Sequence, residues 1–168
     1  MADDTKSYED ILYEEKDGAA WITINRPKVY NAVRPRTCDE LTRAIRHAGW
    51  KREIGVIVLA GVGDKAFCTG GDQSEHDGDY GGTGTIGLPI EELHNAMRDV
   101  PVPIIARVQG FAIGGGNVLA TLCDFTIASE NAVFGQVGPR VGSVDPGWGT
   151  AYLARIVGEK KAREMWYL

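Results

Sequence analysis

Apolar residues along the chain fall into short runs that predict strands. The first two runs flank an Asp17-Gly18 turn signal, as in a hairpin, and the Asn-Arg-Pro run at 25–27 breaks the second. Two later runs are nearly continuous, which favours strands buried on both faces of a parallel sheet. The predicted strands cover residues 11–13, 20–25, 54–60, 104–108 and 125–128.

Apolar positions three and four residues apart predict helices between and after these strands. Thr37 and Glu40 form a capping-box pair that predicts the start of the first helix, which ends near Gly49. A later helix starts directly on the glycines at 114–116. The predicted helices cover residues 37–49, 89–98, 114–122, 152–157 and 159–167. Strands alternating with helices, with a glycine-dotted loop at 78–87, predict one α/β domain over residues 1–168.

Composition and charge exclude several function classes. A net charge of −5 provides no overall field to attract nucleic acid or an anionic membrane, and no stretch reaches membrane-spanning length. Three widely spaced cysteines argue against a disulfide framework or a zinc site. The first fifteen residues lack the features of a signal or transit peptide, so we expect a cytoplasmic protein that binds neither nucleic acid nor membrane.

Two glycine clusters, at 69–72 and 113–117, each follow a predicted buried strand. Backbone amides at a turn or a helix N-terminus are unpaired donors with partial positive charge, so two that converge can bind an oxyanion. The alternative is two tight turns that need glycine for steric reasons. A third glycine stretch, 61–66, matches a G-x-G-x-x-A dinucleotide fingerprint, but more loop and glycine follow where that fingerprint needs a helix.

The two clusters in this order, with Asn-Arg-Pro at 25–27 and Asn-Ala at 31–32 upstream, resemble the crotonase (enoyl-CoA hydratase/isomerase) superfamily. The resemblance implies a crotonase-like α/β fold with a ββα spiral core. It also implies an oxyanion hole at the amides of Gly71 and Gly115, an acyl-CoA substrate that brings coenzyme A with it, no permanently bound cofactor and no metal. The substrate- and coenzyme-binding positions that it implies are Val29, Ala32, Thr69, Gly70, Asp72, Gln73, Ser74, Thr83, Phe111, Ala112, Ile113, Gly114, Gln136, Val137 and Gly138.

Within the superfamily, Val118 and Gly138 stand where hydratases carry two glutamates, which disfavours hydration of a double bond. Residues 134–145 resemble both the naphthoate synthases, which close a ring by a Dieckmann-type condensation, and the 2-ketocyclohexanecarboxyl-CoA hydrolases, which open one. The run 70–78 is more similar to the hydrolases, because the synthases have a basic residue at the place of Ser74. Tyr30 and Thr83 also stand where the synthases have arginine and tyrosine.

The resemblance implies ring-opening hydrolysis of a cyclic β-keto acyl-CoA, of the type that converts 2-ketocyclohexanecarboxyl-CoA to pimeloyl-CoA, through a thioester enolate. Asp145 is the implied acid–base residue, and Ser143 could orient it. The residues alone also fit a simpler interpretation, in which Asp145 begins an Asp-Pro-Gly turn that Ser143 caps. Gly138 leaves space that we expect a small anion or water to fill.

The remaining candidates are weaker. A non-catalytic acyl-CoA-binding or assembly subunit is the alternative from another class, and the retained Ser143 and Asp145 argue against it. We expect His47 and His94 on helix surfaces, His76 in a solvated loop, and Asp124 as the anchor of a helix-to-strand turn. Separately, Lys28 and Arg34 are candidates for the coenzyme phosphates.

Members of this superfamily usually continue for further helices that finish the pocket and build homotrimers or hexamers. The pattern of this chain stops within a helix, so we expect the C-terminal helical part to be missing. We therefore also expect exposed apolar surface, with aggregation or weak folding of the isolated unit.

Overall fold

The computed structural model of the chain describes residues 8–75, 88–143, 145 and 148–168. The predicted loop at 78–87, with Thr83, and the predicted solvated position of His76 lie outside the described residues.

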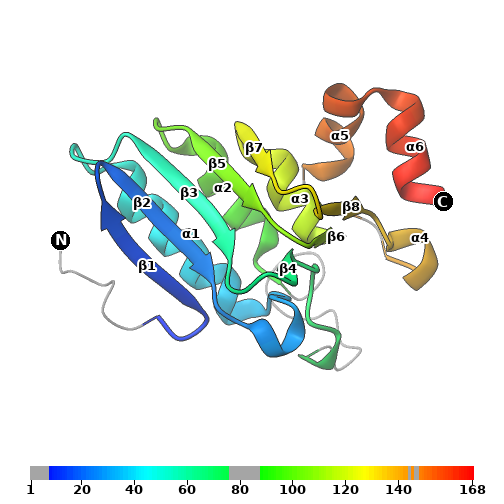
Figure 1. Cartoon of the computed structure of the whole chain (residues 1–168), viewed down its shortest axis with the longest axis horizontal. Coiled ribbons are helices and arrows are strands. Elements are labelled where there is room, and N and C mark those ends of the chain that lie inside the picture. Colours follow the sequence, from blue (N-terminus) through cyan, green and yellow to red (C-terminus); the bar gives the residue numbers. More distant parts are fainter. Residues whose placement is uncertain (1–7, 76–87, 144, 146–147) are drawn as a thin grey trace.

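A five-stranded sheet forms the main layer of the fold (Figure 1). The strands run in the order β1-β2-β3-β5-β7, and β1 pairs antiparallel with β2 while the other neighbours are parallel. Asp17 and Gly18 have φ angles of 53° and 77°, which the tight turn of the predicted hairpin requires. All five predicted strands are confirmed, as β1 Ile11–Lys16, β2 Ala19–Ile24, β3 Val56–Gly61, β5 Ile104–Val108 and β7 Phe125–Ala128.

A second, three-stranded parallel sheet was not predicted. Its strands are three residues long, too short to show a hydrophobic period, and they are β4 Ala66–Cys68, β6 Phe111–Ile113 and β8 Val133–Gly135. Ala66 begins β4 directly after the loop that follows β3, so no helix starts in the stretch 61–66. The structure thereby excludes the dinucleotide-binding interpretation.

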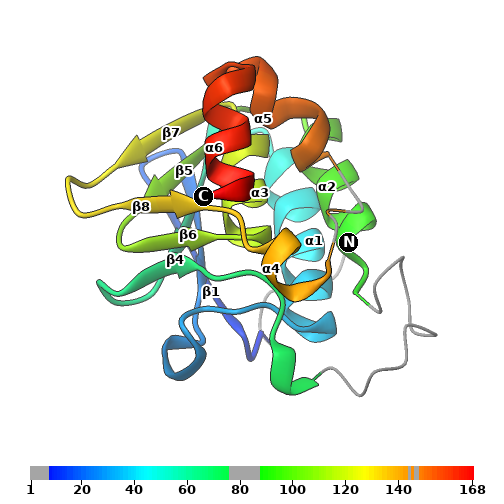
Figure 2. The ribbon, with the colours of Figure 1, turned by 90° about the vertical axis from the view of Figure 1, so that its right-hand side faces the viewer.

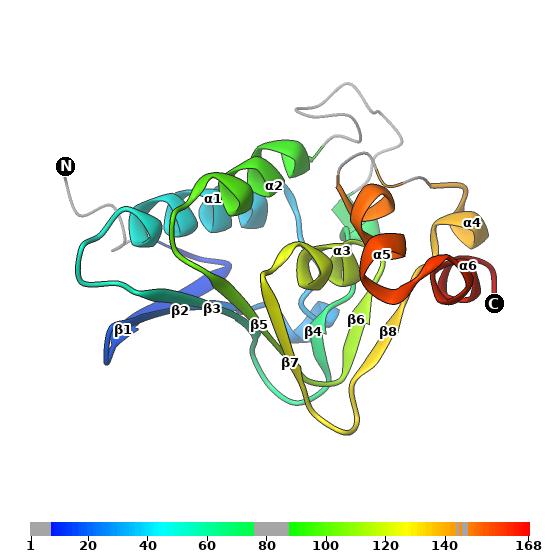
Figure 3. The ribbon, with the colours of Figure 1, turned by 90° about the horizontal axis from the view of Figure 1, so that it is seen from above.

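Helices cover the sheets on one side. Figure 3 shows α1 and α2 side by side on one face of the five-stranded sheet, with α3 between that sheet and α5. In Figure 2, α4 and α6 lie beside β8. The helices are η2 Pro27–Val29, α1 Pro35–Gly49, η3 Gln73–Glu75, α2 Ile90–Asp99, α3 Gly115–Leu122, α4 Gly138–Val141, α5 Gly149–Val157 and α6 Glu159–Tyr167. The predicted helices are confirmed with small shifts of their ends, and α3 does start on glycines.

The predicted capping box at the start of α1 is wrong. The helix begins at Pro35, because proline is tolerated in the first turn, and Thr37 is the third helical residue. The Thr37 hydroxyl accepts a hydrogen bond from the Arg34 amide at 3.2 Å. Glu40 instead accepts the backbone N–H groups of Glu9 and Asp10 at 3.0 and 2.9 Å, which ties the N-terminal segment to the helix.

The hydrophobic core lies between α1–α3 and the two sheets. Phe67, Leu41, Leu59, Leu93 and Leu119 are fully buried in it. As predicted, Asp124 anchors the turn after α3: its amide donates to the Ile104 carbonyl at 2.8 Å and its carboxylate accepts the Ile104 amide at 2.8 Å. Across the described ranges, no helix has the length and apolar character that crossing a bilayer demands.

Candidate active site

The loop after β4 and the first turn of α3 approach each other backbone to backbone. A Cβ on Gly116 would lie 1.9 Å from the Cys68 carbonyl oxygen, and one on Gly70 would lie 3.1 Å from the Gly115 nitrogen. Gly70 also has a φ of 89°, which L side chains rarely adopt. Glycines are therefore needed on both sides for the loop and the helix to meet.

The amides of Gly71 and Gly115 lie at this meeting point. The Gly71 nitrogen is 4.0 Å from the place of a Cβ on Gly115. The bridge that Val33 makes to this loop uses the Gly70 carbonyl and the Asp72 amide, so it leaves the Gly71 N–H out of the ladder. Gly115 is the first residue of α3, whose first-turn amides have no acceptor within the helix and carry its positive dipole end. Both residues line one cavity.

A largely buried ion pair holds the loop that carries Gly71. The Arg26 guanidinium donates to the Asp72 carboxylate at 2.8 Å and to the Ala32 carbonyl at 2.5 Å. The Asp72 amide donates to the Val33 carbonyl at 2.8 Å. Arginine in the Asn-Arg-Pro run thus fixes the residue next to the proposed oxyanion donor.

The Asn31 side chain fastens the same region from the other side. Its carbonyl oxygen accepts the Arg26 amide at 3.0 Å, and its amide group donates to the Ala66 carbonyl at 2.7 Å and the Val62 carbonyl at 3.1 Å. Asn31 is 1% exposed and has a φ of 56°, a conformation that asparagine tolerates better than most residues. The two upstream motifs therefore act as supports of the glycine loop.

Asp72 is ionised in this setting. Burial alone would raise its pKa, but hydrogen bonds from the Ser74 hydroxyl and amide and from Arg26 outweigh burial and hold the pKa below its usual value. Asp10 is ionised for the same reason, because Arg34, Thr37 and Arg26 overcome the effect of its burial and lower its pKa. The loop is thus anchored by two charged carboxylates that share Arg26.

The cavity beside the two amides has a volume of about 220 Å³, the liquid volume of roughly seven water molecules. Of the described residues that line it, only His94 and Asp145 have titratable side chains. The others offer glycine backbone, apolar side chains or neutral polar groups. The described lining is Val33, Thr69, Gly70, Gly71, Gln73, Leu88, Ile90, His94, Gly114, Gly115, Val118, Gln136, Val137, Gly138, Val141, Ser143, Asp145 and Trp166.

Asp145 lies in the segment before α5 and is bonded to that helix. Its Oδ2 accepts the Thr150 amide at 2.7 Å and the Thr150 hydroxyl at 3.3 Å. A helix-capping carboxylate and a cavity carboxylate are compatible roles, because each oxygen has two lone pairs. Ser143 is exposed, and its amide donates to the Gly138 carbonyl at 2.9 Å.

The sequence matches the enoyl-CoA hydratase/isomerase family over residues 14–168. The chain belongs to this family. The match covers both glycine clusters, the cavity and every helix of the described structure.

Several solved structures are similar to the chain. An enoyl-CoA hydratase/carnithine racemase from Magnetospirillum magneticum is 28% identical, with a TM-score of 0.87, over 96% of this chain and 61% of that one. An enoyl-CoA hydratase from Mycobacterium avium subsp. paratuberculosis K-10 is 30% identical, with a TM-score of 0.82, over 95% and 60%. Pseudomonas aeruginosa DspI is 29% identical, with a TM-score of 0.87, over 98% and 63%. The chain therefore spans about three-fifths of the length of these relatives.

The structure gathers most of the expected site residues in one cavity and leaves others outside its described lining. The ones gathered are Gly71, Gly115, Ser143, Asp145, Thr69, Gly70, Gln73, Gly114, Gln136, Val137 and Gly138. The ones outside are Val29, Ala32, Asp72, Ser74, Phe111, Ala112 and Ile113. Asp72 and Ser74 hydrogen-bond to each other, and Ile113 borders a separate hollow beside α3 and α6. Ala112 is fully buried in β6, and its place among the ligand-binding positions stays a prediction.

The sequence interpretation missed His94 as a site residue. It was expected on a helix surface, which is wrong, because its side chain is only 1% exposed and lines the cavity. His94 follows Ile90 by four residues and precedes Met97 by three, and both of these are buried. Its place on the inward apolar stripe of α2 was the signal that could have found it.

Arg34, a candidate for the coenzyme phosphates, pairs with Asp10. Its guanidinium donates to Asp10 at 2.7 and 2.8 Å, so it belongs to the charged anchor of the loop. Lys28, the other candidate for coenzyme phosphates, lies exposed in η2.

Val118 and Gly138 line the cavity, and neither offers a carboxylate. A Cβ on Gly138 would lie 2.5 Å from the Ser143 carbonyl oxygen and 3.0 Å from the Trp166 ring. A longer side chain at 138 would therefore displace this backbone. A small anion or water beside Gly138 stays a prediction, and it would have to lie on the cavity side of these atoms.

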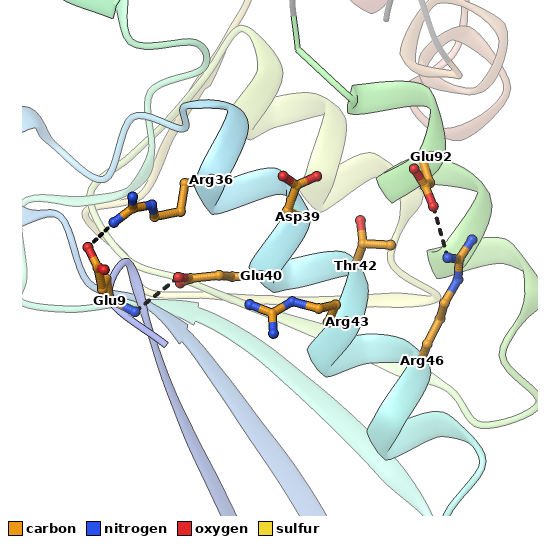
Figure 4. Close-up of a pocket in the computed structure, with 8 residues that line it drawn as sticks. All are labelled: Glu9, Arg36, Asp39, Glu40, Thr42, Arg43, Arg46 and Glu92. Carbon is orange, nitrogen blue, oxygen red and sulfur yellow. Dashed lines mark hydrogen bonds and ion pairs between the residues drawn. The ribbon is translucent and has the colours of Figure 1, made fainter. Parts of the chain in front are cut away.

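A further hollow lies on the outer face of α1 (Figure 4) and is lined by charged residues. Figure 4 shows Arg36 paired with Glu9, and Arg46 paired with Glu92 at 2.9 Å. These pairs are exposed and leave little net field in the hollow, so they act as surface contacts between α1 and its neighbours.

Proposed function

We propose that this chain is an acyl-CoA enzyme that opens the ring of a cyclic β-keto acyl-CoA by hydrolysis. The observation that carries the proposal is that Gly71 and Gly115 approach each other backbone to backbone and line one cavity that Asp145 also lines. Members of the family generally act on acyl-CoA thioesters. A thioester oxygen that becomes an enolate oxygen is the group that two such donors stabilise best.

The reaction proceeds in three steps. Asp145 takes a proton from water, and the water oxygen bonds to the ring ketone carbon, whose C=O electron pair moves onto the ketone oxygen. That pair then re-forms the C=O bond while the ring C–C bond breaks. The electrons of the broken C–C bond move onto the thioester oxygen, which gives an enolate. The α-carbon of the enolate takes the proton back from Asp145. The product is a linear dicarboxylic acid monothioester of the pimeloyl-CoA type.

The rest of the cavity supports this assignment by what it provides and what it omits. Val118 and Gly138 offer no acid or base for adding water across a double bond. Thr69, Gln73, Gln136 and Ser143 give neutral polar groups for the acyl head. Ser143 remains the proposed orienting partner of Asp145.

Ring closure by a Dieckmann-type condensation uses the same enolate in the opposite direction and is the alternative. Ser74 and Thr83 favour opening over closure by their resemblance. A non-catalytic acyl-CoA binder needs no carboxylate beside the two amides, and Asp145 lines their cavity here.

Product analysis tests the proposal. The chain is incubated with a panel of cyclic β-keto thioesters in heavy-oxygen water, and the products are resolved by mass spectrometry. We expect a ring-opened thioester with one heavy oxygen atom in the new carboxylate and with coenzyme A still attached. Release of free coenzyme A, or a ring-closed product from a linear precursor, would point to a different reaction.

A further inference from the structure

His94 is a buried histidine whose ring has no protein partner in the described part of the chain. It lies in the middle of α2 and is 1% exposed, and neither Nδ1 nor Nε2 forms a hydrogen bond there. Buried polar side-chain atoms almost always have a partner, and leaving one unpaired costs free energy. An imidazole kept in this state needs an explanation beyond packing.

The ring lies in the proposed active site. His94 lines the same cavity as the amides of Gly71 and Gly115 and the Asp145 side chain. The helix that carries it packs against the start of α5, because Asn95 accepts a hydrogen bond from the Trp148 indole at 3.3 Å. Nearby, the Arg98 guanidinium lies 5.2 Å from the centre of the Tyr152 ring. A group bound beside Asp145 would therefore meet the α2 face.

The charge state of the ring restricts what it can bind. Burial lowers the pKa of His94 to about 4, although the negative charges of Asp145 and Glu91 oppose the shift. The imidazole is therefore neutral at neutral pH, with one N–H donor and one acceptor nitrogen. A neutral donor suits a carbonyl oxygen, since the contact buries no additional charge.

We propose that His94 donates a hydrogen bond to the ring ketone oxygen of the substrate and so selects β-keto thioesters over thioesters that lack the ketone. This inference rests on the proposed function. In the reaction, the ketone oxygen becomes an alkoxide when the water oxygen adds, and it becomes a carbonyl oxygen again when the ring C–C bond breaks. His94 keeps its own proton throughout, while Asp145 carries the proton from water to the α-carbon.

Binding measurements on variants of the full chain test the proposal. Two ligands are compared, a cyclic β-keto acyl-CoA and the same thioester with a methylene in place of the ketone, in an Asp145→Asn background that arrests turnover. His94→Leu removes both nitrogens at similar volume, and His94→Gln keeps a donor. We expect the parent to prefer the keto ligand, His94→Leu to lose that preference by roughly tenfold to a hundredfold, and His94→Gln to restore part of it.

A spectroscopic readout separates ligand contact from a purely structural role. The chain has three histidines, so the side-chain nitrogen signals of His94 can be assigned by their loss in His94→Leu. We expect these signals to shift with the keto ligand and not with the methylene ligand, and the thermal midpoint of His94→Leu to match or exceed that of the parent.

The other outcomes are distinct. A keto preference that survives in His94→Leu overturns the role of His94 and leaves the proposed function intact. An equal loss of affinity for both ligands assigns His94 a structural role and overturns the inference as well. A parent that binds both ligands equally overturns the ketone contact, and a parent that binds neither overturns the proposed function with it.

Discussion

One side of the cavity is the loop 69–75 with the first turn of α3, and the other is the stretch from Gln136 to Trp166. The first side rests on buried structure: six of the eight residues of α3 are buried, and Arg26 and Val33 bond the loop from below. The second side has little buried structure, since α4 has no buried residue and α6 has only Ala162, and it is called the thin side below.

Because of this difference in burial, the two sides of the cavity suit different parts of the proposed reaction. Backbone amides that stabilise an oxyanion act only at close range, so they need the rigid side. The carboxylate of Asp145, the proposed acid–base group, lies on the thin side. The apolar side chains exposed near that side, Phe125, Ile127 and Ile156, are all more than 60% exposed, which accords with the expected apolar surface.

The largest effect is expected on the thin side, from Asp145→Asn. Asparagine keeps an oxygen that can accept the Thr150 amide, so the fold should be retained while the acid–base group is lost. We expect kcat to fall about 10²- to 10⁴-fold, as measured by product formation, with little change in thermal midpoint. Thr150→Val is the control, because it removes only the 3.3 Å hydroxyl contact, and we expect it to retain most activity. Near-normal turnover by Asp145→Asn would move the acid–base role to another residue.

A pair of leucine truncations compares the stability of the two sides. Leu119 of α3 is fully buried, and Leu119→Ala should cost about 2–5 kcal/mol of unfolding free energy in urea titrations. Leu153 of α5 is 3% exposed on the thin side, and Leu153→Ala should speed amide hydrogen exchange mainly in α5 and α6. Equally faster exchange throughout the chain in Leu153→Ala would show that the two sides unfold as one unit.

A smaller effect is expected from Arg26→Met, which removes the anchor of the rigid side. Asp72 and Asp10 have pKa values below their usual 3.8, so they contribute stability that is fully present above that value and is lost as pH falls through the folded-state pKa. We expect the variant to lose about 1.5–3 kcal/mol at neutral pH and to show a shallower loss of stability below about pH 4. Urea titrations across this range make the measurement.

Arg36→Met is the matched control for Arg26→Met. Arg36 pairs with the exposed Glu9, so its loss should cost less than about 1 kcal/mol and should leave the acid limb unchanged. Equal effects of the two substitutions would contradict the anchoring role of Arg26.

Sequence alone predicted the helices and strands that are long enough to show a hydrophobic pattern. The strands of the main layer are four to six residues long and its helices have apolar stripes, and glycine clusters mark the places where backbones meet. The strands β4, β6 and β8 carry three residues each and are defined by pairing between distant segments, which no local pattern reveals.

The parts of the site that are made of backbone groups could be predicted from the sequence. The parts that depend on side-chain packing could not. Gly70 and Gly116 mark the place where the loop contacts α3, because only glycine fits there. His94 was misplaced because a polar residue on an amphipathic helix is usually exposed, and its burial follows from how α2 packs beside α1 and α3. The role of Arg26 was also hidden, since its partner Asp72 lies 46 residues away.

The most direct test of the central claim compares Gly115→Pro with Gly115→Ala. Both place a Cβ 3.3 Å from the Gly70 Cα, and proline is tolerated at the first position of a helix, but only proline removes the N–H. The readout is the infrared stretching frequency of an isotope-labelled thioester carbonyl in a bound acyl-CoA that does not react. We predict that the carbonyl frequency falls on binding to the parent and to Gly115→Ala, and that Gly115→Pro loses much of this fall together with about 10²- to 10³-fold in turnover. A frequency that does not change on binding to the parent, or that is the same in both variants, would contradict the account.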